Sequence, residues 1–205
     1  VIPAYNEEMN ITSAAREWHT VVETISEDSK LVIIDDGSKD STYQVLTELS
    51  KELPQLEVIT KKNSGHGATV LYGYRYALEQ NADYIFQTDS DGQTLPEEFY
   101  GFWELRDKYS AVIGYRNHRK DGFSRVFVTK TLKFVLWCIF KLNITDANTP
   151  FRLLNRDVLQ RHISKIPKDF NLSNVMLTIC LVKYKENIRF IPITFCLLYT
   201  SPSPR

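Results

Sequence analysis

Residues 31–38 read Leu-Val-Ile-Ile-Asp-Asp-Gly-Ser, four apolar side chains followed by a polar turn. Short apolar runs of this kind are typical of strands that are buried on both faces of a parallel sheet. Residues 84–92 repeat the arrangement, because Tyr-Ile-Phe-Gln-Thr is followed by Asp-Ser-Asp-Gly. Two strands that each end in a carboxylate-rich turn favour an α/β fold with polar groups at the strand ends.

Helix-like and strand-like segments alternate on both sides of these two strands. Apolar residues recur at helical spacing over residues 10–24, 41–53, 68–81, 96–109 and 174–184. Strands are predicted at residues 1–2, 31–34, 56–60, 84–88, 111–114, 151–154 and 189–195. This alternation predicts one α/β domain with a mostly parallel central sheet that is flanked by helices.

The two ends of the chain lead us to expect an incomplete domain. The chain begins inside an apolar strand without an initiator methionine, so we expect a domain over residues 1–195 that is truncated at both ends. Residues 196–205 read Cys-Leu-Leu-Tyr-Thr-Ser-Pro-Ser-Pro-Arg and show no periodicity. They resemble a translated sequencing adapter, and we interpret them as a non-native tail.

Composition narrows the class of partner and the compartment. The 25 basic and 25 acidic residues cancel, so we expect no nucleic-acid partner, despite the basic residues between 116 and 125. Three scattered cysteines indicate reduced thiols and a cytoplasmic location. Residues 126–144 are apolar but carry three lysines, which favours an amphipathic helix over a membrane span. Such a helix fits peripheral contact with the inner face of a membrane, and a core helix with snorkelling lysines equally well.

Four polar clusters lie at predicted strand ends: residues 3–8, 35–38, 65–67 and 89–93. In doubly wound sheets, ligands bind beyond the carboxyl ends of the strands, so we expect these clusters to meet at one edge. The Gly-His-Gly sequence at 65–67 would leave backbone open to a phosphate at a helix start. It has neither dinucleotide-loop nor P-loop spacing, and we interpret His66 as an ordinary loop residue.

The carboxylate pairs admit two interpretations each. Asp89 and Asp91 suit a hard divalent cation such as Mg²⁺ or Mn²⁺, or they cap a turn. Asp35 could cap its turn and Asp36 could accept hydrogen bonds from a ribose or a base, or both residues could serve ordinary turn chemistry. Tyr5 could stack on that base.

Six blocks of sequence occur in an order that resembles one known family. They are VIPAYNEE (1–8), IIDDGSKDST (33–42), NSGHGATVLYGY (63–74), DSDGQ (89–93), GYRNHRKDGFSR (114–125) and DANTPFRLLNRDVL (146–159). Together they resemble the family 2 glycosyltransferases, in the branch of the dolichol-phosphate mannose synthases and polyprenyl-phosphate glycosyltransferases. The resemblance implies the GT-A fold, which binds a nucleoside-diphosphate sugar.

The resemblance also implies a role for individual residues. The residues that it places at the nucleoside are Pro3, Tyr5, Glu7, Ile34 and Asp36. It places Asp89, Ser90 and Asp91 at the metal and the donor, with Gln93 as a further metal or phosphate contact. It places Arg116 at the diphosphate and Arg152 in the donor site. Ala-Asn-Thr-Pro-Phe-Arg at 147–152 replaces the family's usual Thr-Ser-Gly-Phe-Arg, which leaves the acceptor open.

By this resemblance the chain is a metal-dependent, inverting hexosyltransferase of cell-envelope glycan synthesis. The donor is GDP-mannose or a UDP-hexose, and the expected acceptor is a polyprenyl or dolichyl phosphate. The metal ion, which Asp91 would help to bind, and Arg116 would stabilise the leaving diphosphate. A glycan hydroxyl as acceptor would instead require a base, for which Asp121 and Asp146 are candidates. A nucleotidyltransferase and a non-catalytic nucleotide-sugar binding module are the alternatives from other classes.

Overall fold

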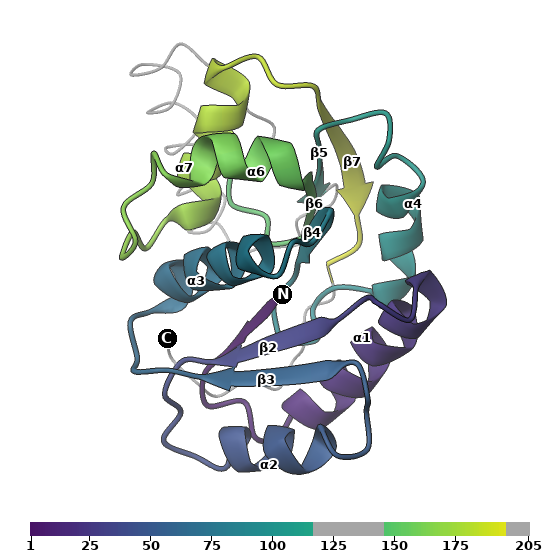
Figure 1. Cartoon of the computed structure of the whole chain (residues 1–205), viewed down its shortest axis with the longest axis vertical. Coiled ribbons are helices and arrows are strands. Elements are labelled where there is room, and N and C mark those ends of the chain that lie inside the picture. The colour runs from purple at the N-terminus through teal and green to yellow at the C-terminus, as the bar shows by residue number, and fades with distance from the viewer. Residues whose placement is uncertain (117–145, 196–205) are drawn as a thin grey trace.

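A computed structural model describes residues 1–116 and 146–195 of the chain (Figure 1). Strands β1 (Ile2–Ala4), β2 (Leu31–Asp35) and β3 (Leu56–Thr60) form a parallel sheet in the order β1-β2-β3. Strands β4 (Tyr84–Gln87), β5 (Ala111–Arg116), β6 (Arg152–Asn155) and β7 (Ile188–Ile193) form a second sheet in the order β4-β6-β5-β7.

Strands β1 and β4 connect the two sheets. The Val1 amine donates to the Phe86 carbonyl at 2.7 Å, and the Thr88 amide donates to the Val1 carbonyl at 3.3 Å. One residue that bonds to two residues of its neighbour in this way has the pattern of a parallel pair. Strand β6 runs antiparallel to β4 and β5, while β7 is parallel to β5. The α/β architecture is therefore confirmed, with β6 as an antiparallel strand inside a mostly parallel arrangement.

Helices cover the sheets on both faces. They are α1 (Ile11–Ile25), α2 (Thr42–Leu49), α3 (His66–Glu79), the 3₁₀ helix η1 (Pro96–Glu98), α4 (Phe99–Trp103), α6 (Arg156–Ile163) and α7 (Ser173–Lys183). One hydrophobic core joins α1, α2 and α4 to the sheets, and a second joins α3, α6 and α7 to them. Neighbouring strand residues alternate between the cores, since Val112 belongs to the first and Ile113 to the second.

Aromatic packing supports β4 directly below the predicted carboxylate turn. The ring of Phe86 lies 5.4 Å from Trp18, 4.9 Å from Phe99 and 4.7 Å from Phe151, measured between centroids. Aromatic pairs at these distances add to the stabilisation that burial provides. The strand that carries the turn therefore rests on a dense part of the first core.

Two local predictions were wrong, and one helix was missed. Pro3 lies inside β1 rather than closing it, opposite Ile34 in the parallel register. The helix expected over 96–109 is broken into η1 and the short α4. Helix α6 was not predicted, although Asn155 caps it by accepting a hydrogen bond from the Val158 amide at 2.9 Å.

Within the described part of the chain, no helix is long and apolar enough to cross a membrane. The amphipathic helix expected over residues 126–144 lies outside the described residues.

Candidate donor site

The first two polar clusters meet at the carboxyl ends of β1 and β2. The Asn6 amide donates to Ser38 Oγ at 3.0 Å, and the Lys39 amide donates to Asn6 Oδ1 at 2.8 Å. The Glu7 amide donates to Thr42 Oγ1 at 2.8 Å. These bonds clip the segment after β1 to the turn after β2. Tyr5 remains 41% exposed at this edge, where a flat ligand could stack on its ring.

Asp35 stabilises its own turn. Its carboxylate accepts hydrogen bonds from the Ser38 amide at 3.2 and 3.4 Å and from the Thr60 hydroxyl at 2.8 Å. The side chain is buried at the end of β2. The capping role predicted for Asp35 is therefore confirmed.

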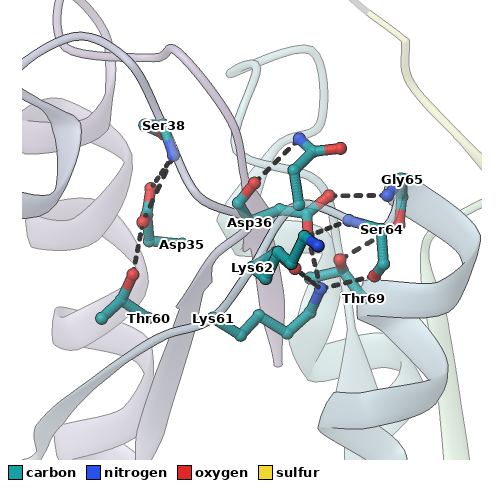
Figure 2. A network of polar contacts seen from close by, with 10 residues as sticks. Asp35, Asp36, Ser38, Thr60, Lys61, Lys62, Ser64, Gly65 and Thr69 are labelled. Atoms are coloured by element: carbon teal, nitrogen blue, oxygen red, sulfur yellow. Dashed lines mark hydrogen bonds and ion pairs between the residues drawn. The ribbon is translucent and has the colours of Figure 1, made fainter.

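Asp36 organises the segment that leads into α3 (Figure 2). Its Oδ1 accepts from the Ser64 amide at 2.9 Å, and its Oδ2 accepts from the Gly65 amide at 2.9 Å. The Lys61 ammonium pairs with the same carboxylate and donates to Ser64 Oγ at 2.5 Å. Both carboxylate oxygens thus bind groups of this chain, and Asp36 acts here by fixing residues 61–65 in place.

The glycines of the third cluster serve packing as well as the start of α3. Gly65 has φ +89°, a conformation that favours glycine. A Cβ on Gly67 would lie 2.1 Å from the carbonyl oxygen of Asn171 and 2.6 Å from that of Phe170. The backbone that comes close to Gly67 therefore belongs to the segment before α7. The sequence predicts that this space admits a phosphate, but at Gly67 the backbone of residues 170–171 occupies it.

The fourth cluster follows β4 and includes the two candidate metal ligands. Asp89 Oδ1 lies 2.8 Å from His66 Nε2, and Asp91 Oδ1 accepts from the Gln93 amide at 3.2 Å. The intervening Ser90 is buried. The sequence did not predict the contact between His66 and Asp89. The two residues are 23 positions apart, and no motif around His66 indicates a partner.

Asp89 and Asp91 fit a divalent cation whose remaining ligands come from a diphosphate and water. Among the described residues, no group of three or more His, Cys, Asp or Glu side chains forms a closed metal site. Mg²⁺ commonly binds one or two carboxylates and fills its remaining positions with phosphate oxygens and water. A pair of carboxylates such as Asp89 and Asp91 suits that mode of binding.

Buried polar contacts brace this turn from below. The hydroxyls of Thr88 and Thr94 lie 3.0 Å apart in the interior. The Tyr74 hydroxyl donates to Gln87 Oε1 at 2.5 Å, and burial raises the pKa of Tyr74. Thr94 also forms an isolated antiparallel bridge with Phe195. The segment between Thr88 and Thr94 is therefore fixed at both of its ends.

Arg152 lies in the interior and is not exposed at the carboxyl ends of β1, β2 and β4, which we call the donor edge. It is fully buried; its Nε and Nη2 donate to the Thr149 carbonyl at 3.0 and 2.6 Å. Its Nη1 donates to the Asn174 carbonyl at 3.2 Å and to Thr178 Oγ1 at 3.3 Å. Burial lowers the pKa of Arg152. In this structure the guanidinium holds the turn before β6 against α7, and it is not presented to a diphosphate.

The other predicted site residues occupy varied environments. Pro3 and Ile34 are buried opposite each other in β1 and β2. Arg116 ends β5, and its guanidinium carbon lies 4.0 Å from the centroid of the Phe195 ring. Asp146 is buried, and its Oδ1 accepts from the Asn148 amide at 3.3 Å. Asp121 lies outside the described residues.

This arrangement of sheets and helices is that of a GT-A glycosyltransferase domain. The chain belongs to glycosyl transferase family 2, whose sequence model matches residues 1–163. Among curated proteins it is similar to an undecaprenyl-phosphate 4-deoxy-4-formamido-L-arabinose transferase of Pseudomonas fluorescens. The two are 26% identical over 162 residues, which are 78% of this chain and 47% of that protein. A transferase of the same name from Salmonella choleraesuis is 28% identical over 66% of this chain and 42% of its own length. The chain thus spans less than half of these relatives.

Solved structures support the same fold. Glucosyl-3-phosphoglycerate synthase from Mycobacterium tuberculosis, in complex with UDP, matches with a TM-score of 0.69 at 16% identity. The match covers 98% of this chain and 71% of that one. The same enzyme has been crystallised with Mn²⁺, UDP and glucosyl-3-phosphoglycerate. TarS 1–349 from S. aureus matches with a TM-score of 0.62 at 19% identity, over 93% of this chain and 56% of that one.

Proposed function

We propose that this chain transfers a sugar from a nucleoside-diphosphate sugar to a polyprenyl phosphate, with inversion at the anomeric carbon and with a divalent cation. The observation that carries the proposal is the carboxylate pair Asp89 and Asp91 in the turn after β4. The buried hydroxyls of Thr88 and Thr94 stabilise this turn, which contacts the start of α3 at His66. The relatives named as undecaprenyl-phosphate transferases support the acceptor class.

Each residue of the donor edge has a role in this proposal. Tyr5 stacks on the base and Glu7 accepts from the base edge, while Asp36 fixes the segment that borders the nucleoside. Asp89 and Asp91 hold Mg²⁺ or Mn²⁺, and Gln93 adds a contact to the metal or to a phosphate. The cation supplies charge stabilisation for the leaving diphosphate. Arg116 adds a fixed positive charge at the end of β5.

The acceptor determines whether the protein needs a general base. A phosphate oxygen of a lipid phosphate is already anionic and can attack the anomeric carbon without losing a proton, whereas a sugar hydroxyl cannot. Of the two carboxylates considered as bases, Asp146 is buried and already accepts a backbone hydrogen bond. That placement argues against Asp146 as a general base, while Asp121 lies outside the described residues. A cytoplasmic position at the inner face of a membrane, with peripheral contact, would bring the site to such a lipid.

Thermal unfolding with UDP- and GDP-sugars, each with and without Mn²⁺, tests the donor site. A ligand at about 100 times its dissociation constant stabilises the folded state by about 2.7 kcal/mol, which raises the melting temperature by several degrees. We expect a rise with one base that depends on Mn²⁺. Asp91→Ala should abolish the metal-dependent part. Asp83→Ala, an exposed carboxylate just before the other end of β4, should leave it unchanged.

The acceptor is tested by measuring sugar transfer to undecaprenyl phosphate. The donor is the nucleotide sugar that binds in the thermal assay. Labelled product should partition into the lipid phase with the unaltered chain and should be absent with Asp91→Ala. Transfer to a soluble glycan in place of the lipid would replace the proposed acceptor. A metal-independent thermal response to every nucleotide would contradict the cation's role.

A further inference from the structure

A histidine contacts the first carboxylate of the candidate metal site. His66 is the first residue of α3, and its Nε2 lies 2.8 Å from Asp89 Oδ1. The Asp89 side chain is 16% exposed and that of His66 is 44% exposed, so the pair lies at the surface of the donor edge. The contact joins the third polar cluster of the sequence to the fourth.

The backbone that carries His66 is held from several sides. Asp36 accepts from the amides of Ser64 and Gly65, the two residues that precede it. The Thr69 amide and hydroxyl both bond to the Gly65 carbonyl at 3.0 Å. On the other side of His66, Gly67 packs against the backbone of residues 170–171. The imidazole therefore projects from a backbone that has little freedom to move.

We propose that His66 is a positioning residue for Asp89, and that it orients this carboxylate for the divalent cation; the inference rests on the proposed function. A carboxylate has two oxygens with about four lone-pair sites, so Asp89 can accept from His66 and still bind a cation. Hydrogen-bonded partners of metal ligands typically change metal affinity by about 10–100-fold when they are removed. The side chain of Asp36 and that of Asp89 are then linked through Gly65 and His66, which couples the nucleoside side of the site to its metal side.

The test measures Mn²⁺ affinity directly rather than turnover. Free Mn²⁺ is followed by electron paramagnetic resonance while MnCl₂ is titrated into the chain at a fixed concentration of UDP and, in parallel, of GDP. His66→Ala should weaken Mn²⁺ binding about tenfold. His66→Gln retains an N–H donor and should recover most of the affinity. Nucleotide affinity without metal, and the melting temperature without ligand, should be unchanged in both variants.

A matched substitution on the same helix controls for general effects on α3. Tyr72 is 40% exposed on that helix, and Tyr72→Ala should leave Mn²⁺ affinity as it is in the unaltered chain. Equal Mn²⁺ affinity in His66→Ala and the unaltered chain would overturn the positioning role while leaving the proposed function intact. A loss of metal-free nucleotide binding in His66→Ala would overturn it in favour of a general structural role. Absence of Mn²⁺ binding by the unaltered chain with both nucleotides would overturn the proposed metal site as well.

Discussion

Asp36 and Arg152 are both buried charges, but the segments that they hold in place lie in different parts of the molecule. Asp36 is 3% exposed and binds Lys61 and two backbone amides on the segment that enters α3. Arg152 is fully buried and donates to backbone carbonyls on the turn before β6 and on α7. The segment that Asp36 fixes continues into His66 and the candidate metal site, while the segment that Arg152 fixes is interior.

The comparison separates two ways in which a buried charge can matter. An ion that leaves water must recover its lost solvation from partners of the protein, so both charges order the chain around them. Only the segment ordered by Asp36 reaches the donor edge. We therefore expect Arg152 variants to lose stability and Asp36 variants to lose both stability and donor binding.

The largest effect is expected for Arg152→Met. The carbonyls of Thr149 and Asn174 lose charged donors in the interior, and the cost should be about 4 kcal/mol of unfolding free energy, measured by urea denaturation. Arg152→Lys should recover only part of it, because one ammonium cannot reproduce the planar set of donors. The comparison would break if Arg152→Lys kept full stability and lost nucleotide binding, since Arg152 would then contact the donor.

Asp36→Ala should cost about 3 kcal/mol, because it leaves the Lys61 ammonium and the amides of Ser64 and Gly65 without their shared acceptor. Metal-dependent nucleotide binding should be lost at a temperature where the variant is still folded, as followed by isothermal titration. Asp36→Asn keeps one acceptor oxygen, so its unfolding free energy and its nucleotide affinity should lie between those of Asp36→Ala and the unaltered chain. Full donor affinity in a folded Asp36→Ala would show that the ordered segment does not serve the site.

Gly67→Ala tests whether α3 must pack against the segment before α7. The added Cβ would lie 2.1 Å from the Asn171 carbonyl oxygen, and overpacking of this kind costs about 2 kcal/mol. Gly101→Ala on α4 is the matched control, because a Cβ there meets nothing within 4 Å. That change should stabilise the chain by up to about 1 kcal/mol, since alanine favours helix over glycine. Equal unfolding free energies for the two variants would contradict the close packing at Gly67.

The sequence predicted the fold better than it predicted contacts within the site. The apolar run at 31–34 and the alternation of helix and strand were sufficient for the α/β class, because the periodicity of side chains follows burial directly. The direction of β6 was not predictable in the same way, since apolar strands read alike whichever way they run. Helix α6 was missed, although its Asn155 cap and apolar stripe were present.

Contacts within the site depend on which strand ends lie next to each other. The convergence of Asp36 with Gly65 followed from the rule for parallel strands, but the bonds that occupy both oxygens of its carboxylate did not. His66 has no partner nearby in sequence, and only the placement of α3 beside β4 brings it to Asp89. Arg152 had the sequence context of a donor residue, yet its position at the start of a central strand buries it.

Glu186 is a third charge with partners on this chain, and we expect its removal to cost less unfolding free energy than removal of Asp36 or Arg152. Its carboxylate accepts from Arg161 Nη2 at 2.9 Å and from His162 Nε2 at 2.7 Å, at the partly buried turn after α7. Burial raises the pKa of Glu186, but the bonds from Arg161 and His162 lower it more, so the pKa lies below its ordinary value of 4.5. The ionised carboxylate therefore adds stability above about pH 4.5, and this contribution is lost as the pH falls through the lowered pKa.

Glu186→Gln should reduce the unfolding free energy at pH 7 by about 1 kcal/mol, the upper end for ion pairs near the surface. The difference from the unaltered chain should shrink as the pH falls below 4.5, followed by urea denaturation at several pH values. Glu52→Gln is the control, because both side chains of its pair with Arg16 are more than half exposed and screening leaves such a pair little net effect. A cost for Glu186→Gln as large as that for Asp36→Ala would mean that the depth of burial does not set the size of these effects. The difference expected between the two buried charges and Glu186 would then need another explanation.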